Sequence, residues 1–114
     1  MTDKTASAVP YANQVEICGR VSADPVQRTL PSGDTLTTFR LIVDRSRRAR
    51  KRSKVKVDTF DCVAWTAAQQ HAAARLSAGD VVAVNGELHR RFQRGPGGPS
   101  SRIDIEVLRC RRLA

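Results

Sequence analysis

Five stretches of the chain have residue patterns typical of β-strands, and in the first and last of them apolar and polar residues alternate as in a half-buried strand. The first stretch is the clearest, because Val15, Ile17, Gly19 and Val21 alternate with polar residues. The other predicted strands are residues 36–43, 57–64, 81–92 and 102–108. Each side chain in such a strand points to the face opposite its neighbours, so the alternation predicts one face against a core.

The period changes between the third and fourth predicted strands. Ala68, Ala72 and Leu76 fall at helical spacing in an alanine-rich segment, which favours a helix over residues 65–76. We expect Thr66 to cap the start of this helix and Gly79 to stop it. The order is then three strands, one helix and two strands.

This order matches an all-β fold with one helix, the five-stranded Greek-key barrel of the OB type, with its helix between strands 3 and 4. Within the fourth strand, Asn85-Gly86 is expected to form a bulge rather than a turn. The chain divides into a flexible N-terminal arm, residues 1–13, and one OB-fold domain, residues 14–114. Residues 94–100 are expected to form a flexible loop.

The chain is strongly basic, with 20 Lys and Arg against 11 Asp and Glu, a formal net charge of +9. Eight of the twelve residues in 45–56 are basic and none is acidic, so this segment is expected to be a solvated hairpin loop or a mobile arm. Such charge indicates a polyanionic partner, namely nucleic acid, an anionic membrane surface or an acidic protein. The alternative is a generally basic surface.

No stretch reaches the roughly 20 apolar residues that span a bilayer, and residues 1–13 lack the apolar centre of a signal peptide. We therefore expect a cytoplasmic protein without a membrane partner. Cys18, Cys62 and Cys110 lie far apart, in neither a zinc nor a disulfide pattern. His71 and His89 have no partner spacing that indicates a metal. No metal or other cofactor is expected.

Catalysis is not expected from this sequence. Asp58 and Asp61 form no obvious acid–base pair, and Cys62 has no convincing base near it in the chain. The glycines of residues 95–98 are interrupted by proline and open no helix, so they do not form a phosphate cradle.

Four segments, in this order and with these gaps, resemble the bacterial single-stranded DNA-binding protein family across residues 15–113. They are VEICGRVSADP at 15–25, PSG followed by FRL between 31 and 41, FDCVAW at 60–65, and LSAGDVVAVNGEL at 76–88. The resemblance implies binding of single-stranded DNA by a basic groove that follows the phosphates and by aromatic rings that stack on bases.

The resemblance also implies positions for those rings. Trp65 falls on a stacking position of the family, with a buried core tryptophan as the alternative interpretation. Phe60 lies one residue beyond another such position, which is Thr59 here, so Phe60 is expected in the core. Phe92 resembles the aromatic residue after the fourth strand but comes one residue early, and a bulge at Asn85-Gly86 would restore its orientation.

The family's loop aromatic corresponds to Arg47, whose guanidinium can stack on a base and hold a phosphate. The predicted DNA-binding residues are two rings and eight basic side chains: Trp65, Phe92, Arg45, Arg47, Arg48, Arg50, Lys51, Arg90, Arg91 and Arg94.

The expected function is sequence-independent coating of single-stranded DNA in replication, recombination and repair, in the nucleoid. The resemblance implies a homotetramer, with a dimer as the alternative. The chain ends at Leu113-Ala114 without the acidic tip by which family members recruit enzymes, so it is either a tail-less member or a trimmed form. Two other functions stay open: a helicase-docking accessory protein similar to primosomal replication protein N, and an RNA-binding OB domain.

Overall fold

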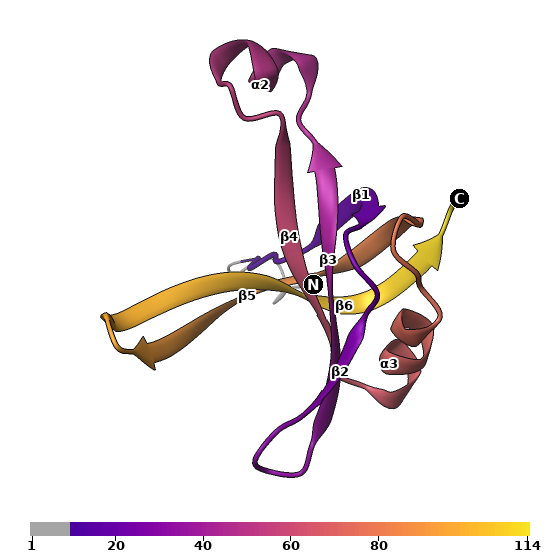
Figure 1. Ribbon diagram of the computed structural model, residues 1–114, viewed down its shortest axis with the longest axis vertical. Coiled ribbons are helices and arrows are strands. Elements are labelled where there is room, and N and C mark those ends of the chain that lie inside the picture. The colour runs from indigo at the N-terminus through magenta and orange to yellow at the C-terminus, as the bar shows by residue number, and fades with distance from the viewer. Residues whose placement is uncertain (1–9) are drawn as a thin grey trace, which may run out of the picture.

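The computed structural model describes residues 10–114, and the first nine residues of the predicted N-terminal arm lie outside that range. The last residue of the arm is fixed, because the Asn13 side chain donates to the Leu88 carbonyl and accepts from the Leu88 N–H, both at 2.8 Å. The elements (Figure 1) are β1 Val15–Val21, β2 Val26–Thr29, β3 Thr35–Asp44, α2 Arg47–Arg52, β4 Val57–Ala64, α3 Ala67–Ala74, β5 Val81–Gly95 and β6 Gly98–Arg112.

Five strands close a ring. β1 pairs with β5, β5 with β6, β4 with β3, and β3 with β1, all antiparallel. β6 and β4 run parallel, with Cys62 opposite Ile105 and Val63 opposite Glu106. A closed ring leaves few unpaired edges, which is how small barrels avoid edge-to-edge association. The predicted OB-type barrel is confirmed.

Two elements depart from the prediction of five strands and one helix. β2 is a sixth strand that pairs only with β3, from Val26 opposite Thr38 to Thr29 opposite Thr35. All four of its residues are exposed, so no apolar alternation marks it in the sequence. The basic segment carries a second helix, α2, whose N–H at Ala49 donates to the Ser46 hydroxyl at 3.2 Å. Arginine and lysine are good helix formers, and this explains a helix where we expected a loop or arm.

Helix α3 begins as predicted, because the Thr66 hydroxyl accepts from the Gln69 N–H at 3.1 Å. It ends at Ala74 with Arg75 as its cap, earlier than predicted. Gly79 therefore does not end the helix but takes a positive φ of 91° in the turn into β5. Ala73 of α3 and Leu76, just after it, are both buried in the core. Helix α3 and the turn after it therefore close one end of the barrel.

The core is built from the inward positions of the strands. Its largest fully buried side chains are Leu41, Ile105, Val21, Val82, Val84, Val107 and Cys62. Phe60 packs against this cluster, as predicted from its strand position. Burial raises the pKa of the Cys62 thiol to about 12, so this side chain stays protonated and fills space as an apolar group.

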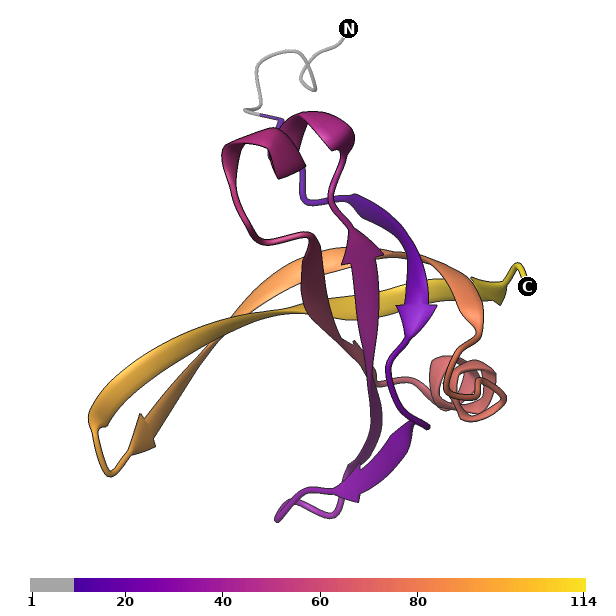
Figure 2. The same ribbon diagram turned by 45° about the horizontal axis from the view of Figure 1, so that its top comes forward.

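The β5–β6 pair shifts register between Asn85 and Gly86, as predicted, but the extra residue lies on β6: Asn85 is opposite Arg109 and Gly86 is opposite Val107, which leaves Leu108 unpaired. At Gly86 the two backbones come so close that an added Cβ would overlap the carbonyl oxygen of Glu106 and lie 2.9 Å from Cγ2 of Ile105. Beyond the bulge, the β5–β6 hairpin leaves the barrel as a long arm, and the β3–β4 hairpin carries α2 outward in another direction (Figures 1 and 2). The barrel thus presents two projecting hairpins around one outer surface.

Candidate nucleic-acid interface

A groove of about 480 Å³ crosses the outer surface of the barrel. Its lining comes from β2, β3, β4 and the β5–β6 hairpin, and includes Arg28, Arg40, Arg91, Arg102, Asp61, Asp104, Val63 and Gln93. In an OB barrel this strand face and its flanking loops are the surface that binds oligonucleotides.

Carboxylates hold three of the groove's arginines. Asp61 accepts from Arg40 at 2.9 Å and from Arg102 at 2.8 Å, so it joins β3, β4 and β6. Burial alone would raise the pKa of Asp61, but the hydrogen bonds and charges of the two guanidiniums outweigh it and lower this pKa. Sequence reasoning missed Arg40 and Arg102. Alternation with buried Phe39 and Leu41 marks Arg40 as outward-facing, which was an available signal.

Trp65 follows directly after β4, is half-buried, and lies outside the core cluster of the described residues. The alternative interpretation of a core tryptophan is therefore not supported. Its ring lies under the Arg91 guanidinium, with Cζ 5.6 Å from the ring centroid, a cation–π distance.

An ion pair with Asp104 holds Arg91 in place. Its Nε lies 2.6 Å from Oδ2 of Asp104, whose side chain is only 10% exposed. A charge-assisted bond to a nearly buried carboxylate fixes the guanidinium more firmly than an exposed ion pair does. Trp65 and Arg91 therefore form one preorganised cation–aromatic unit at the edge of the groove.

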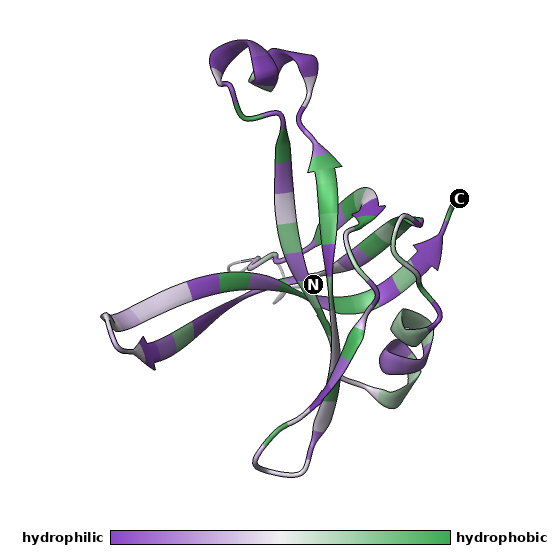
Figure 3. Cartoon of the chain, in the orientation of Figure 1, coloured by the Kyte–Doolittle hydropathy of each residue, from purple (hydrophilic) through white to green (hydrophobic). Residues whose placement is uncertain are grey.

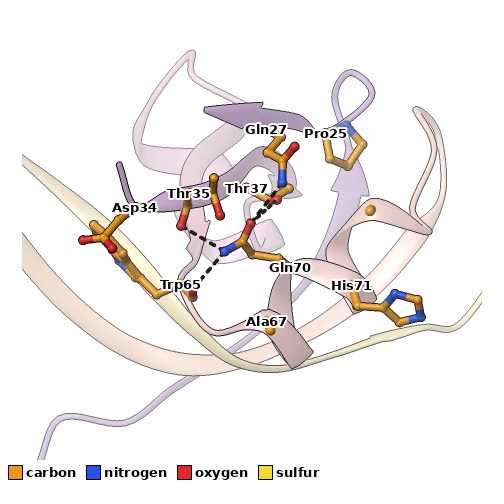
Figure 4. A pocket seen from close by; sticks show the side chains of 10 residues that line it. Pro25, Gln27, Asp34, Thr35, Thr37, Trp65, Ala67, Gln70 and His71 are labelled. Carbon is orange, nitrogen blue, oxygen red and sulfur yellow. Dashed lines mark hydrogen bonds between the residues drawn. The ribbon is translucent and has the colours of Figure 1, made fainter. Parts of the chain in front are cut away.

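Trp65 also lines a second cleft, of about 800 Å³, between the β2–β3 turn and α3. Figure 4 shows Gln70 at the centre of this cleft. Its amide donates to the carbonyls of Thr35 and Trp65, both at 2.9 Å, and accepts from the Thr37 hydroxyl at 3.4 Å. Gln70 thus fixes the backbone of Trp65 and leaves the indole ring free of hydrogen bonds to it.

Phe92 is 80% exposed on the β5–β6 hairpin. Its neighbours Arg91 and Gln93 line the groove, and alternation along β5 puts Phe92 on the other face of the hairpin. Arg90 belongs to the same face as Phe92 and donates to the Ser101 hydroxyl at 3.1 Å. The register shift at Asn85 and Gly86 does not bring the Phe92 ring to the groove. A role of Phe92 in binding DNA stays a prediction. Arg94 is exposed near the hairpin tip.

Helix α2 carries the densest charge, and Figure 3 shows it as strongly hydrophilic. Its residues Arg47, Arg48, Arg50 and Lys51 are exposed, and none of them forms an ion pair with another described residue. Arg45 differs, because it donates two bonds to Asp58 at 2.9 and 3.0 Å. Those bonds raise the pKa of Arg45 and lower the pKa of Asp58.

The groove and α2 are joined by one face of the β3–β4 hairpin. The residue pairs along this face are Thr38–Val63, Arg40–Asp61, Ile42–Thr59 and Asp44–Val57. Alternation puts these four pairs on the same side of the two strands, and the last pair adjoins the segment that carries α2. A continuous strip therefore leads from Trp65, past the groove arginines, to the basic helix.

The sequence model described as the single-strand binding protein family matches residues 12–112. The chain belongs to this family. It is 33% identical over 86 residues to a single-stranded DNA-binding protein of Bacillus cereus, covering 75% of this chain and 50% of that one. A single-stranded DNA-binding protein of Thermotoga maritima is 31% identical over 99 residues, covering 86% and 70%.

A solved structure titled "Plasmodium falciparum SSB complex with ssDNA" has the same fold as this family member, with a TM-score of 0.76 at 24% identity. The likeness covers 94% of this chain and 99% of that one. The family member described here spans about half the length of the Bacillus relatives it matches. Among the described residues, no helix has the length and apolarity needed to cross a membrane.

Proposed function

We propose that this chain binds single-stranded DNA without sequence preference. Its relatives are named single-stranded DNA-binding proteins. The observation that carries the proposal is the arginine-lined groove of the OB barrel with the half-buried Trp65 at its edge. The alternatives, a helicase-docking accessory protein and an RNA-binding domain, are not favoured by the family match.

Bases stack on Trp65. Stacking suits a protein without sequence preference because every base has a flat π-face, and one stacked base contributes about 1–3 kcal/mol. Arg91 lies over the ring before DNA arrives, and Asp104 keeps hold of its guanidinium. An incoming base either enters on the free side of the indole or takes the place of Arg91, which then turns toward the adjacent phosphate.

Phosphates are held by the groove arginines and by α2. Within the groove, Asp61 and Asp104 offset two of the four arginine charges. A larger uncompensated charge lies on α2, at Arg47, Arg48, Arg50 and Lys51, so α2 supplies most of the electrostatic attraction. Arg90, Arg94 and Phe92 extend the DNA-binding surface along the β5–β6 hairpin. The DNA strand passes around the edge of this hairpin to reach them.

The chain acts as a homotetramer in this proposal. The β5–β6 hairpin exposes Leu88 and Ile103, two apolar side chains at the base of the arm that leaves the barrel. A second copy that covers these two side chains would remove apolar surface from water and leave Phe92 free for DNA. Sedimentation equilibrium of the chain distinguishes four copies from two.

The biological role that follows is to coat and protect single strands in replication, recombination and repair, in the bacterial cytoplasm at the nucleoid. The protein performs no catalysis in this role.

Replacing Trp65 with Ala should weaken binding of oligo-dT by about 1–3 kcal/mol, a factor of roughly 5 to 150. The slope of log affinity against log salt should stay the same, because no phosphate contact is lost. Fluorescence anisotropy of a labelled oligonucleotide at several salt concentrations measures both quantities.

The matched control is Trp65→Phe, which keeps a flat ring and should retain most of the affinity. Gln70 bonds to the backbone carbonyl of Trp65 and not to its side chain, so neither substitution removes a hydrogen bond of Gln70. An alanine variant that binds as tightly as the unchanged protein would remove Trp65 from the interface.

A further inference from the structure

Three potential metal ligands meet on the β5–β6 hairpin beside the groove. Glu87 and Glu106 are directly opposite each other across the two strands, and His89 follows Glu87 by two positions on the same face. The ligand atoms of these three side chains all lie within 4.8 Å of one another. Sequence spacing gave no sign of this cluster, because Glu106 reaches it only through strand pairing.

The charges of the cluster favour a bound cation. Two carboxylates directly opposite on adjacent strands repel each other. Both ring nitrogens of His89 face carboxylate oxygens, Nε2 toward Glu87 at 3.4 Å and Nδ1 toward Glu106 at 3.3 Å. A neutral imidazole has a single N–H donor, so one of these two contacts sets a lone pair against a carboxylate.

The remaining charged groups on this face do not resolve the imbalance. Asp104, opposite His89, adds a third carboxylate, and Arg91 is committed to Asp104 at 2.6 Å. A positive species between Glu87, His89 and Glu106 would turn both close contacts into favourable ones. A metal ion is such a species.

We propose that Glu87, His89 and Glu106 bind a divalent transition-metal ion such as Zn²⁺. One imidazole nitrogen and two carboxylates form a donor set that Zn²⁺ accepts, at about 2.0–2.2 Å per ligand. Ligands at that distance lie at most about 4.4 Å apart, so the present spacing of up to 4.8 Å closes with small side-chain rotations. All three side chains are partly exposed, which allows those rotations and leaves coordination positions open to solvent.

Because the site lies beside the groove, we expect the bound ion to affect DNA binding. This expectation rests on the proposed function. Glu106 is opposite Val63, which lines the groove, and Glu87, His89 and Arg91 follow one another along the same face of β5. Without the ion, two carboxylates repel an approaching phosphate. With it, their charge is offset and an open coordination position faces the strand, where a phosphate oxygen can fill it.

Zn²⁺ binding to the chain without DNA tests the site itself. Isothermal titration should give one ion per chain, and the Glu87→Gln/Glu106→Gln double variant should lose at least about tenfold in affinity. The control is Glu16→Gln, an exposed carboxylate on β1 outside the cluster, which should leave affinity unchanged.

Histidine ring signals in NMR identify the ligand, because the chain has two histidines. The His89 signals should shift with one equivalent of Zn²⁺ while those of His71, on α3, stay in place. Equal shifts of both rings, or binding retained by the double variant, would mean that Zn²⁺ binds elsewhere, such as at exposed Cys18, and would overturn the proposal. His89 signals that do not respond to Zn²⁺ would likewise overturn the proposal.

The second step compares oligo-dT affinity in EDTA with affinity in one equivalent of Zn²⁺, within each variant. We expect Zn²⁺ to tighten binding several-fold for the unchanged chain and to have no effect on the double variant. A bound ion that leaves DNA affinity unchanged would contradict the coupling. DNA binding in EDTA without any Zn²⁺ site would leave the proposed function standing and remove this inference, so the two fail separately.

Discussion

Changing Arg47, Arg48, Arg50 and Lys51 of α2 together to Gln should lower the affinity for oligo-dT about 100-fold or more at moderate salt. All four side chains are exposed and without ion pairs among the described residues, so their charge is available to phosphates. Each phosphate contact adds about 0.7 to the salt slope for single strands, so the slope should fall by up to about 3. Anisotropy titrations between low and high salt measure the slope directly.

The fold should survive this change. α2 buries no residue, Ser46 remains as its cap, and Gln forms helices about as well as Arg and Lys. A loss of DNA affinity in this variant therefore reports on the interface and not on unfolding, which a thermal melt checks.

The control removes four charges elsewhere. Arg75, Arg109, Arg111 and Arg112 are exposed near the opposite end of the barrel, on the cap of α3 and the last part of β6. Changing these four to Gln gives the same net charge as the α2 variant. Similar slopes for the two variants would mean that overall charge, and not α2, attracts the strand.

Gly86→Ala should destabilise the protein by about 3 kcal/mol or more, near the upper end for overpacking. The added Cβ would overlap the Glu106 carbonyl oxygen, a backbone atom that cannot rotate away as a side chain can. Relief requires β5 and β6 to separate at the bulge, where Ile105 and Val107 fill the core. The midpoint of urea unfolding, followed by Trp65 fluorescence, measures the loss.

Gly95→Ala is the matched control at the far end of the same strand. A Cβ there meets nothing within 4 Å and the backbone φ is not positive, so stability should stay within about 0.5 kcal/mol. Both proteins must be compared at one concentration, because self-association adds to apparent stability. Equal stability of the two variants would contradict the close approach at Gly86.

The sequence was informative wherever a local rule determines structure. Alternation and strand-favouring residues identified the five strands of the barrel, Thr66 marked the start of α3, and Asn85-Gly86 marked the register shift, although not the strand that carries the extra residue. β2 was missed because it has no buried side chain and exists through its pairing with β3. α2 was missed because like charges masked the helix propensity of arginine and lysine.

The candidate site was partly predictable for the same reason. Strand parity put Trp65 outside and Phe60 inside, and both are so placed. Contacts between distant segments were not accessible, since Arg91 meets Trp65 and Asp61 meets Arg102 only after β4, β5 and β6 are brought together. The orientation of Phe92 depended on which of the two strands carries the extra residue at the register shift, and this residue is Leu108 of β6, which spacing along β5 does not reveal.

The most direct test of the central claim, that this chain binds single-stranded DNA against Trp65, is a titration of its intrinsic tryptophan fluorescence with oligo-dT at low and high salt. The chain has one tryptophan, so the signal reports on Trp65 alone. We predict strong quenching that saturates at stoichiometric oligo-dT, weakens with salt, and is much smaller with duplex DNA of equal length. Absence of quenching, together with no binding in the anisotropy assay, would contradict the account.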